Sequence, residues 1–328
     1  MKPFITLKRR AATKLFAMTT TLALCLTFSA TASAWWWNTG YTDTKYPIVL
    51  AHGMLGFDNI GPIDYWYGIP EALESDGADV YVAQLSSFGS AELRGEQLLA
   101  QVEDILAITG AQKVNLIGHS QGGHTVRYVA GVASNLVASV TTVGGPAKGT
   151  PVADLIAVLP ELPVVGDFLA TSIGGAVNLV GWLIGVSAGE TLPQESLGSL
   201  ALLSSAGSQQ FNESFPGGVP TSTCGEGAYN ANGVNYYSWS GTGASYGPTN
   251  VFDISSYGLL LPAALLFNEA NDGMVGRCSS HIGKVIRDNY YMDHLDEVNQ
   301  IFGLTDAWTT NPKTVYRQQA NRLKNAGL

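Results

Sequence analysis

The stretch VNLIGHSQGGHTVRYVAGVA, residues 114–133, decides the fold. An apolar, β-branched run ends at Gly118, a second apolar run with helical spacing begins near Gly122, and Ser120 lies between them in the pattern G-x-S-x-G. Between a strand and a helix, this pentapeptide is typical of a nucleophile elbow. Its glycines let the chain turn without Cβ clashes and place the serine at a helix N-terminus, where developing negative charge is favoured. Ser120 is therefore the candidate nucleophile.

The surrounding pattern predicts alternating strands and helices. The segment 90–110 is expected to be a helix, with Ser90 as its N-cap, Gly110 just past its end, and Leu98 and Val102 on one apolar face. Strands are expected at 46–52, 79–85, 113–118, 136–145 and 236–241. This order indicates an α/β fold with a mostly parallel sheet, helices on both faces, and catalytic groups at the carboxyl ends of the strands.

The first 34 residues have the features of a secretory signal peptide. They carry five basic residues, no acidic ones, a short apolar stretch and a small-residue run ending at Ala34. Because the apolar stretch is too short for a membrane span, we predict cleavage after Ala34 and export through the periplasm to the extracellular medium. A lipoprotein anchor at Cys25 is the alternative, but Leu24 stands where such sites need a small side chain. Residues 35–328 contain no linker and are expected to form one domain.

Charge and cysteine content limit the partners. Loss of the leader removes five of 17 basic residues and none of the 26 acidic ones, which leaves a formal charge of about −14. Such an acidic chain is not expected to bind nucleic acid, and its surplus carboxylates can hold a hard cation such as Ca2+. Cys25 leaves with the signal peptide, so Cys224 and Cys278 remain in an oxidising compartment, where a disulfide between them is expected.

The segment 152–190 interrupts the alternation of strands and helices. It is nearly free of positive charge, and its part GGAVNLVGWLIGVSAG (174–189) has apolar residues at helical spacing. A buried core helix is one interpretation, but an apolar insertion outside the repeat pattern favours a lid over a binding cleft. A second G-x-S-x-G at 185–189 lacks the flanking strand and helix, and we interpret it as a chance match.

A serine nucleophile needs a base and an orienting acid, which in this type of fold follow the serine in the order acid, histidine. Of the five histidines, His281 and His294 lie well beyond Ser120, and chain order alone does not choose between them. Asp272 is the candidate acid, because it lies in a turn-forming Asn-Asp-Gly sequence after an apolar run. The alternative is that Asp272 is simply a turn residue.

Acyl transfer also needs N–H donors for a tetrahedral oxyanion, and removal of one donor costs about 3–4 kcal/mol. One candidate donor is the backbone N–H of Gln121, next to the nucleophile. The other is the backbone N–H of Met54, in the loop after the first expected strand.

Together these residues resemble the secreted bacterial triacylglycerol lipases of the Pseudomonas type. That family has the α/β-hydrolase fold and matures with the help of a membrane-anchored foldase. The resemblance runs through nearly the whole chain after the signal peptide. Its motifs are YPIVLAHGMLGFD (46–58), VNLIGHSQGG (114–123), GGPAKGTPVADL (144–155), CGEGAYNANGVNYYSWSG (224–241), NDGMVGRCSSHIGKVIRDNY (271–290) and MDHLDEVNQIFGL (292–304).

The resemblance implies a role for each matching residue. It implies the nucleophile, base and acid Ser120, His294 and Asp272, the oxyanion donors Met54 and Gln121, and a disulfide between Cys224 and Cys278. It also implies a structural calcium ion, held by the carboxylates of Asp253 and Asp296 and the main-chain oxygens of Gln300 and Leu304. Without the resemblance, Asp253 would be interpreted as a helix N-cap and Asp296 as a solvated charge.

The sequence thus predicts a secreted α/β-hydrolase that cleaves esters of water-insoluble triacylglycerols at a lipid–water interface. It would use a Ser-His-Asp triad, one structural Ca2+, a lid that opens at the interface and a foldase during secretion. An esterase or phospholipase with the same triad is the nearest alternative. A non-catalytic protein that binds lipid surfaces is the more distant one, because it requires the elbow, the triad order and the oxyanion loop to coincide by accident.

Overall fold

The computed structural model of this 328-residue chain describes residues 40–54, 59–60, 63–158, 194–245, 260–261, 263–305 and 308–328. Tyr41–Leu328 form one compact unit. Several predictions fall outside the described residues: the signal peptide, the second G-x-S-x-G, Asp253, and the part of the expected lid from 159 to 190.

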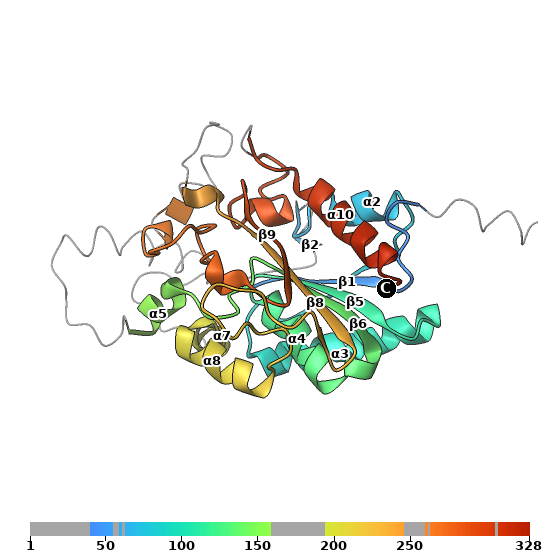
Figure 1. Cartoon of the computed structure of the whole chain (residues 1–328), viewed down its shortest axis with the longest axis horizontal. Helices are drawn as coiled ribbons and strands as arrows, with labels where there is room; N and C mark the ends of the chain where they lie inside the picture. The colour runs from blue at the N-terminus through green and yellow to red at the C-terminus, as the bar shows by residue number, and fades with distance from the viewer. Residues whose placement is uncertain are drawn as a thin grey trace, which may run out of the picture. The chain divides into compact units, whose positions relative to one another are not determined.

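A central sheet, seven-stranded in the described part of the chain, organises the larger unit (Figure 1). Its spatial order is β4 (Val80–Val82), β1 (Ile48–Ala51), β5 (Val114–His119), β6 (Val137–Val143), β8 (Val234–Gly241) and β7 (Asn230–Ala231), and β9 (Lys284–Tyr290) also pairs with β8. All pairs are parallel except β7 with β8. The strands β2 (Asn59–Ile60) and β3 (Ile63–Asp64) form a separate hairpin. The mostly parallel sheet is therefore confirmed.

Helices cover both faces of this sheet, as expected for a doubly wound α/β fold (Figure 1). On one face lie α3 (Ala91–Thr109) and α4 (Gly122–Val132), and on the other α2 (Ile69–Glu74) and α10 (Pro312–Asn325). Neighbouring residues of β1 alternate between the two cores, because Val49 packs in the α3–α4 core and Ile48 in the α2–α10 core. Each fully buried side chain of this size stabilises the fold by roughly 1.5–3 kcal/mol.

The ends of α3 lie where the sequence predicts them. The Ser90 side chain accepts a hydrogen bond from the Leu93 N–H, and Gly110 ends the helix in the left-handed conformation with φ 70°. Leu98 and Val102 are fully buried against the sheet. The capping serine and the terminal glycine satisfy backbone groups that an uncapped helix would leave without partners.

The remaining helices lie in the other connecting segments, and the 3-10 helix of residues 134–136 directly precedes β6. Asp154 accepts hydrogen bonds from the N–H (2.8 Å) and hydroxyl (2.6 Å) of Ser205, which joins the beginning of the predicted lid segment to the first residue of α8. These helices are α5 (Pro151–Val158), α7 (Gln194–Leu203), α8 (Ser205–Ser214), η1 (Ser134–Leu136), η3 (Gly243–Ser245), η4 (Cys278–Ser280) and η5 (Asp296–Val298).

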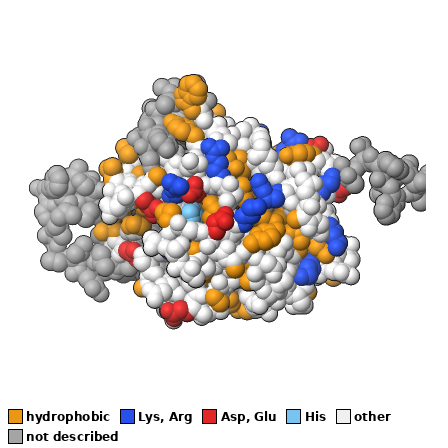
Figure 2. Space-filling view, in the orientation of Figure 1, with side chains coloured by type: hydrophobic (Ala, Val, Ile, Leu, Met, Phe, Trp, Pro, Cys, Tyr) orange, Lys and Arg blue, Asp and Glu red, His pale blue; other side chains and the backbone are white. Residues whose placement is uncertain are grey.

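The described surface mixes apolar and charged groups. No helix among the described residues is long and apolar enough to cross a membrane. Figure 2 shows hydrophobic side chains in separate groups between charged and polar ones on the visible face. Large apolar side chains that are mostly exposed include Leu265 (76%) and Trp308 (72%). Scattered exposed apolar residues of this kind are normal on protein surfaces.

Candidate active site

The turn between β5 and α4 has the geometry of a nucleophile elbow. Ser120 adopts a left-handed backbone conformation with φ 55°, directly between the last residue of the strand and the first turn of the helix. A Cβ at Gly118 would lie 2.2 Å from the Gly122 oxygen, and one at Gly122 would lie 2.2 Å from the Ala51 oxygen. Both positions therefore require glycine, and the strained serine conformation is of the kind found at catalytic turns.

Backbone hydrogen bonds hold Ser120 at the carboxyl edge of the sheet. Its N–H donates to the Val143 oxygen at 2.9 Å, and its carbonyl accepts from the Gly123 N–H at 2.9 Å. Among the described residues the Ser120 hydroxyl has no hydrogen bond. The hydroxyl is thus left for an incoming group, at the N-terminus of a buried helix.

Asp272 and His294 are brought together by the loops after β8 and β9. Nδ1 of His294 donates to Oδ2 of Asp272 at 2.7 Å, and both residues are at most 5% exposed. The other carboxylate oxygen of Asp272 accepts from the N–H groups of Met274 (2.8 Å) and Val275 (2.6 Å). The turn position predicted for Asp272 is confirmed, although its neighbour Asn271 forms only an isolated bridge with Gly276 instead of ending a regular strand.

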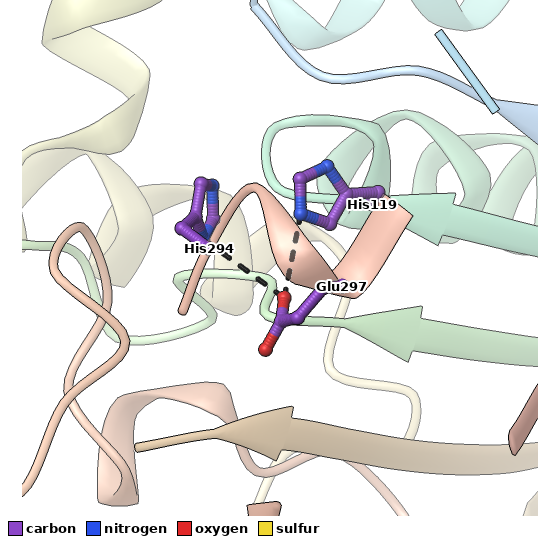
Figure 3. A group of neighbouring side chains, drawn as sticks. All are labelled: His119, His294 and Glu297. Atoms are coloured by element: carbon purple, nitrogen blue, oxygen red, sulfur yellow. Dashed lines mark ion pairs between the residues drawn. The ribbon is translucent and has the colours of Figure 1, made fainter. Parts of the chain in front are cut away.

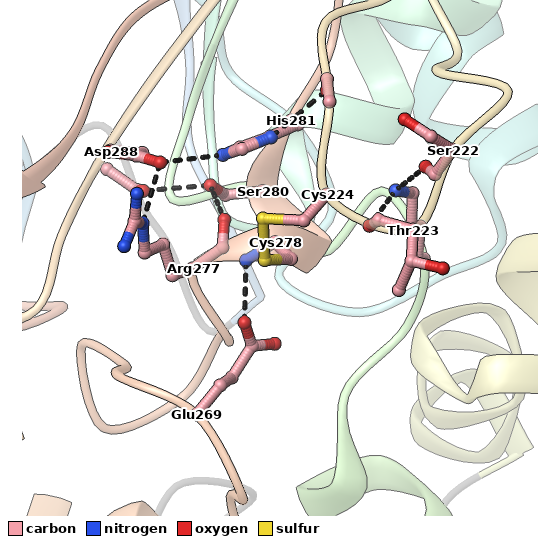
Figure 4. Close-up of a disulfide and its surroundings, with 12 residues drawn as sticks. Ser222, Thr223, Cys224, Glu269, Arg277, Cys278, Ser280, His281 and Asp288 are labelled. Atoms are coloured by element: carbon pink, nitrogen blue, oxygen red, sulfur yellow. Dashed lines mark hydrogen bonds and ion pairs between the residues drawn. A yellow bond between two sulfur atoms is a disulfide. The ribbon is translucent and has the colours of Figure 1, made fainter.

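His281, the other candidate base, lies in a different environment. Its Nε2 is 3.1 Å from Oδ2 of Asp288, and its Nδ1 is 3.1 Å from the Gly225 oxygen (Figure 4). Arg277 also binds Asp288, at 2.7 Å. Of the two histidines between which chain order did not choose, His294 is therefore the one that is hydrogen-bonded to Asp272.

The disulfide between Cys224 and Cys278 is present, as predicted. The two Cα atoms are 4.6 Å apart, and 54 residues separate the cysteines in the chain (Figure 4). Nearby, Lys148 Nζ donates to the carbonyl oxygens of Ser222 and Thr223. The disulfide therefore fixes the segment that directly follows the Asp272 loop to the segment that leads into β8.

The loop after β1 passes directly beside the elbow. A Cβ at Gly53 would lie 2.7 Å from Cβ of Ser120, so only glycine allows this approach. Met54 follows in the chain and packs in an apolar cluster with Leu295, the neighbour of His294. Gly53 and Ser120 meet at this contact. The residues that follow them in the chain, Met54 and Gln121, are the two predicted oxyanion donors.

Known proteins are similar to this chain over most of its length. A family profile described as the alpha/beta hydrolase fold matches residues 46–282. The chain belongs to the α/β-hydrolase family. A protein named triacylglycerol lipase from Vibrio cholerae is 56% identical to this hydrolase over 290 residues, which cover 88% of this chain and 91% of that protein. Another protein of that name, from Pseudarthrobacter phenanthrenivorans, is 43% identical over 320 residues and covers 88% and 99% of the two chains.

A solved structure supports the fold of the hydrolase. The mature form of Bacillus licheniformis lipase BlEst2 aligns with a TM-score of 0.59 at 17% sequence identity. The alignment covers 86% of this chain and 93% of that one. At this low identity the likeness concerns the fold.

Arg94 is a buried residue of the hydrolase that the sequence analysis missed. Its guanidinium donates to the carbonyl oxygens of His52 and Ser86 and, at 3.3 Å, to the hydroxyl of Thr125. Burial lowers the pKa of Arg94 to about 10, which still leaves it charged at neutral pH. Arg94 lies four residues before Leu98, on the apolar face of α3. This helical spacing was a signal in the sequence that the arginine is buried.

Glu297 is a second buried group that the sequence analysis missed. Its Oε2 is 3.3 Å from Nε2 of His119 and 3.9 Å from Nδ1 of His294, and its Oε1 accepts from the Gly241 N–H at 2.6 Å (Figure 3). Burial, followed by the negative charge of Asp272, raises the pKa of Glu297 well above its ordinary value. Burial, followed by the positive charge of His294, lowers the pKa of His119. The raised pKa favours a protonated, neutral carboxyl group on Glu297, and the lowered pKa favours a neutral imidazole on His119.

The residues expected to hold calcium are partly described. Asp296 is 2% exposed, and its Oδ2 accepts from the N–H of Asp293 at 3.1 Å. Asp272, Asp293, Asp296 and Glu297 are all buried, and the negative charges of the three aspartates contribute to the raised pKa of Glu297. A divalent cation would offset this concentration of buried acids, and carboxylate and carbonyl oxygens are the donors that calcium prefers. The donor set that is described therefore fits the ion.

Proposed function

We propose that this α/β-hydrolase is a triacylglycerol lipase that uses Ser120, His294 and Asp272. The single observation that carries the proposal is the bonded pair of His294 and Asp272 on loops that follow the elbow serine in the order acid, base. The identity of 56% with a protein named triacylglycerol lipase supports the substrate class.

In this proposal, Ser120 Oγ attacks the ester carbonyl while Nε2 of His294 takes the serine proton. The carbonyl π electrons move to oxygen, and collapse of the tetrahedral intermediate expels the alcohol, which receives the proton from His294. Water, deprotonated by His294, then attacks the acyl-serine, and the second tetrahedral intermediate releases the fatty acid as Ser120 Oγ takes the proton back from His294. Asp272 fixes the tautomer of His294, because its carboxylate accepts the Nδ1 proton. The backbone N–H groups of Met54 and Gln121 are the proposed donors to the oxyanion.

The apolar surroundings support an acyl ester as substrate. Val152, Leu200, Leu260 and Ala263 form a buried cluster, against which Met54, Phe88, Leu266, Phe267, Met274 and Leu295 pack. Two of the residues that pack against this cluster belong to the proposed site: Met54 is a proposed oxyanion donor, and Leu295 directly follows His294. The predicted lid over 152–190 would cover such a surface in water and open it at a lipid interface.

Three further proposals accompany this function. We infer a structural Ca2+ at Asp296, with Asp253 and the main-chain oxygens of Gln300 and Leu304 as the other ligands. We also infer export with cleavage after Ala34, and assistance by a foldase, on the basis of the leader composition and the resemblance of the motifs. Calcium would supply structural support to the loop that follows His294.

The test is hydrolysis of a short-chain triacylglycerol, titrated from below to above its solubility limit, by the wild type and by folded Ser120→Ala. A rate that depends on Ser120 and rises sharply at emulsion formation is expected for a lipase with a mobile lid. Ordinary saturation below the solubility limit would identify an esterase. A Ser120→Ala protein that retains the wild-type rate would exclude the mechanism.

A further inference from the structure

A chain of polar contacts links the loop beside Ser120 to the interior behind His294. The N–H of Gly53 donates to the phenol oxygen of Tyr65 at 3.0 Å. The same oxygen is 2.7 Å from Nδ1 of His119, whose Nε2 faces Glu297 at 3.3 Å. Figure 3 shows that the carboxyl group of Glu297 faces both His119 and His294 from one side. Neither Tyr65 nor His119 has a role in the reaction as described so far.

The phenol of Tyr65 and the elbow serine both lie next to the position that a side chain at Gly53 would occupy. A Cβ at that glycine would be 2.9 Å from the Tyr65 oxygen and 2.7 Å from Cβ of Ser120. The Gly53 N–H is used by Tyr65, so the next N–H in the chain, that of Met54, is left for the oxyanion. The position and orientation of that N–H depend on the peptide that the tyrosine holds.

Tyr65 is itself held firmly. The side-chain amide of Gln300 donates to the backbone carbonyl oxygen of Tyr65 at 3.3 Å, and that of Asn299 donates to the backbone carbonyl oxygen of Tyr67 at 2.6 Å. The Tyr65 ring packs at 5.3 Å from Trp66, whose side chain is 1% exposed. Burial raises the pKa of the phenol, so it stays protonated and can take part in hydrogen bonds on both sides.

We propose that Tyr65 and His119 are positioning residues that orient the oxyanion loop relative to Ser120. The inference rests on the proposed function, in which Met54 donates to the oxyanion. His119 locks the phenol, the phenol holds the Gly53 amide, and the Met54 N–H is thereby aimed at the developing negative charge. The link works with either tautomer of His119, because the phenol accepts from Gly53 in both cases.

The orientation of the oxyanion loop should affect the stability of the transition state. An oxyanion donor acts on charge that develops during the reaction, so a misplaced donor lowers kcat and leaves substrate binding nearly unchanged. Tyr65→Phe removes only the hydroxyl. Deletion of a donor lowers kcat by about 100- to 1000-fold, so a donor that is displaced but present should lower it by roughly 10- to 100-fold.

Three substitutions at His119 distinguish the roles of its two ring nitrogens. His119→Asn places an amide near the position of Nδ1 and can still bond to Tyr65. His119→Gln places its amide near the position of Nε2, which faces Glu297, and His119→Leu bonds to neither. The expected order of kcat is wild type, then His119→Asn, then His119→Gln and His119→Leu together. A purely structural role of the buried ring would make asparagine and glutamine equally harmful.

The experiment measures kcat and KM for a soluble short-chain ester, and the rate of inactivation by an organophosphonate, which forms a tetrahedral adduct at the serine. Tyr65→Phe should lower kcat and the inactivation rate by the same factor, with KM within about twofold. The double variant Tyr65→Phe with His119→Leu should be no slower than the slower single variant, because the two act in one link. Wild-type kcat in folded Tyr65→Phe, or equal kcat in the two amide variants, would overturn the inference.

Amide hydrogen exchange gives a readout that does not depend on activity. In Tyr65→Phe the Gly53 amide loses its acceptor, so its exchange should become at least about tenfold faster, while exchange in β1 remains unchanged. Unchanged exchange at Gly53 would overturn the inference even in an inactive preparation. Absence of any Ser120-dependent rate in the wild type would instead refute the proposed function.

Discussion

The imidazole of His294 and the carboxylate of Asp272 are joined by a hydrogen bond of 2.7 Å between Nδ1 and Oδ2. A second bond joins their backbones, because the His294 N–H donates to the Asp272 oxygen at 2.8 Å. The double link connects two loops that are 22 residues apart in the chain. It fixes the orientation of the imidazole as well as its tautomer, which is what a base beside a serine requires.

The first prediction contrasts the two late histidines. His294→Gln should lower kcat for ester hydrolysis by at least about 1000-fold, because serine then has no base. His281→Gln should leave kcat within about twofold of the wild type, because His281 pairs with Asp288 away from Asp272. The measurement is kcat at saturating soluble ester, with thermal unfolding to show that both variants fold. A comparable loss in His281→Gln would refute the assignment.

The second prediction concerns Arg94. Arg94→Met keeps the length of the side chain but leaves the buried carbonyl oxygens of His52 and Ser86 without this donor. The free energy of unfolding should fall by about 2–3 kcal/mol, since an unsatisfied buried polar group costs about 1–3 kcal/mol. Urea denaturation measures the change. The matched control is Ile108→Ala on the same helix, where the side chain is 77% exposed and the expected change is below about 0.5 kcal/mol.

The third prediction is a loss of stability in acid caused by His124. Burial, followed by the positive charge of Arg127, lowers the pKa of His124 to about 3 from an ordinary value of 6.5. The unfolded chain therefore binds a proton below pH 6.5 that the folded chain does not, so stability is lost as the pH falls. Between pH 6.5 and 4.5 the loss from this group should be roughly 2 kcal/mol.

His124→Gln isolates that loss. Glutamine can replace the contact of His124 Nε2 with the Ser208 hydroxyl, at 3.3 Å, without titrating. Urea midpoints at pH 6.5 and 4.5 should therefore differ by less in the variant than in the wild type. Equal differences in the two proteins would show that His124 does not contribute to acid unfolding.

The fold was largely predictable because its signals are local. Alternating buried strands and amphipathic helices have distinct periodicities, and the ends of α3 follow from the chemistry of Ser90 and Gly110. The short strands β2, β3 and β7 were not predicted, since elements of two residues carry no periodicity. The segment after His294 forms only the 3-10 turn η5, which is likewise too short to have a periodicity.

The site was predictable only in part because its geometry is formed by distant segments. Ser120 has a local signature, whereas the choice of His294 over His281 depends on contact with Asp272, which periodicity cannot show. Glu297 lies three residues after His294, but an acid beside a histidine in sequence is ordinarily a solvated charge. Its burial results from packing against β8, where the Gly241 N–H binds it. Long-range packing therefore determines what the local pattern leaves open.

The last prediction concerns calcium and the loop after His294. If Asp296 holds the ion, a chelator should lower the unfolding temperature of the wild type, because a ligand bound only to the folded state stabilises it by about 2.7 kcal/mol at 100 times its dissociation constant. Asp296→Asn should already unfold at the lower temperature and respond little to added Ca2+. Asp104→Asn, which removes an exposed carboxylate from α3, controls for the change in net charge and should retain the full calcium response. Equal calcium responses in all three proteins would place the ion elsewhere. A selective loss in Asp296→Asn would link the ion to the segment that also carries Asn299, whose amide holds Tyr67.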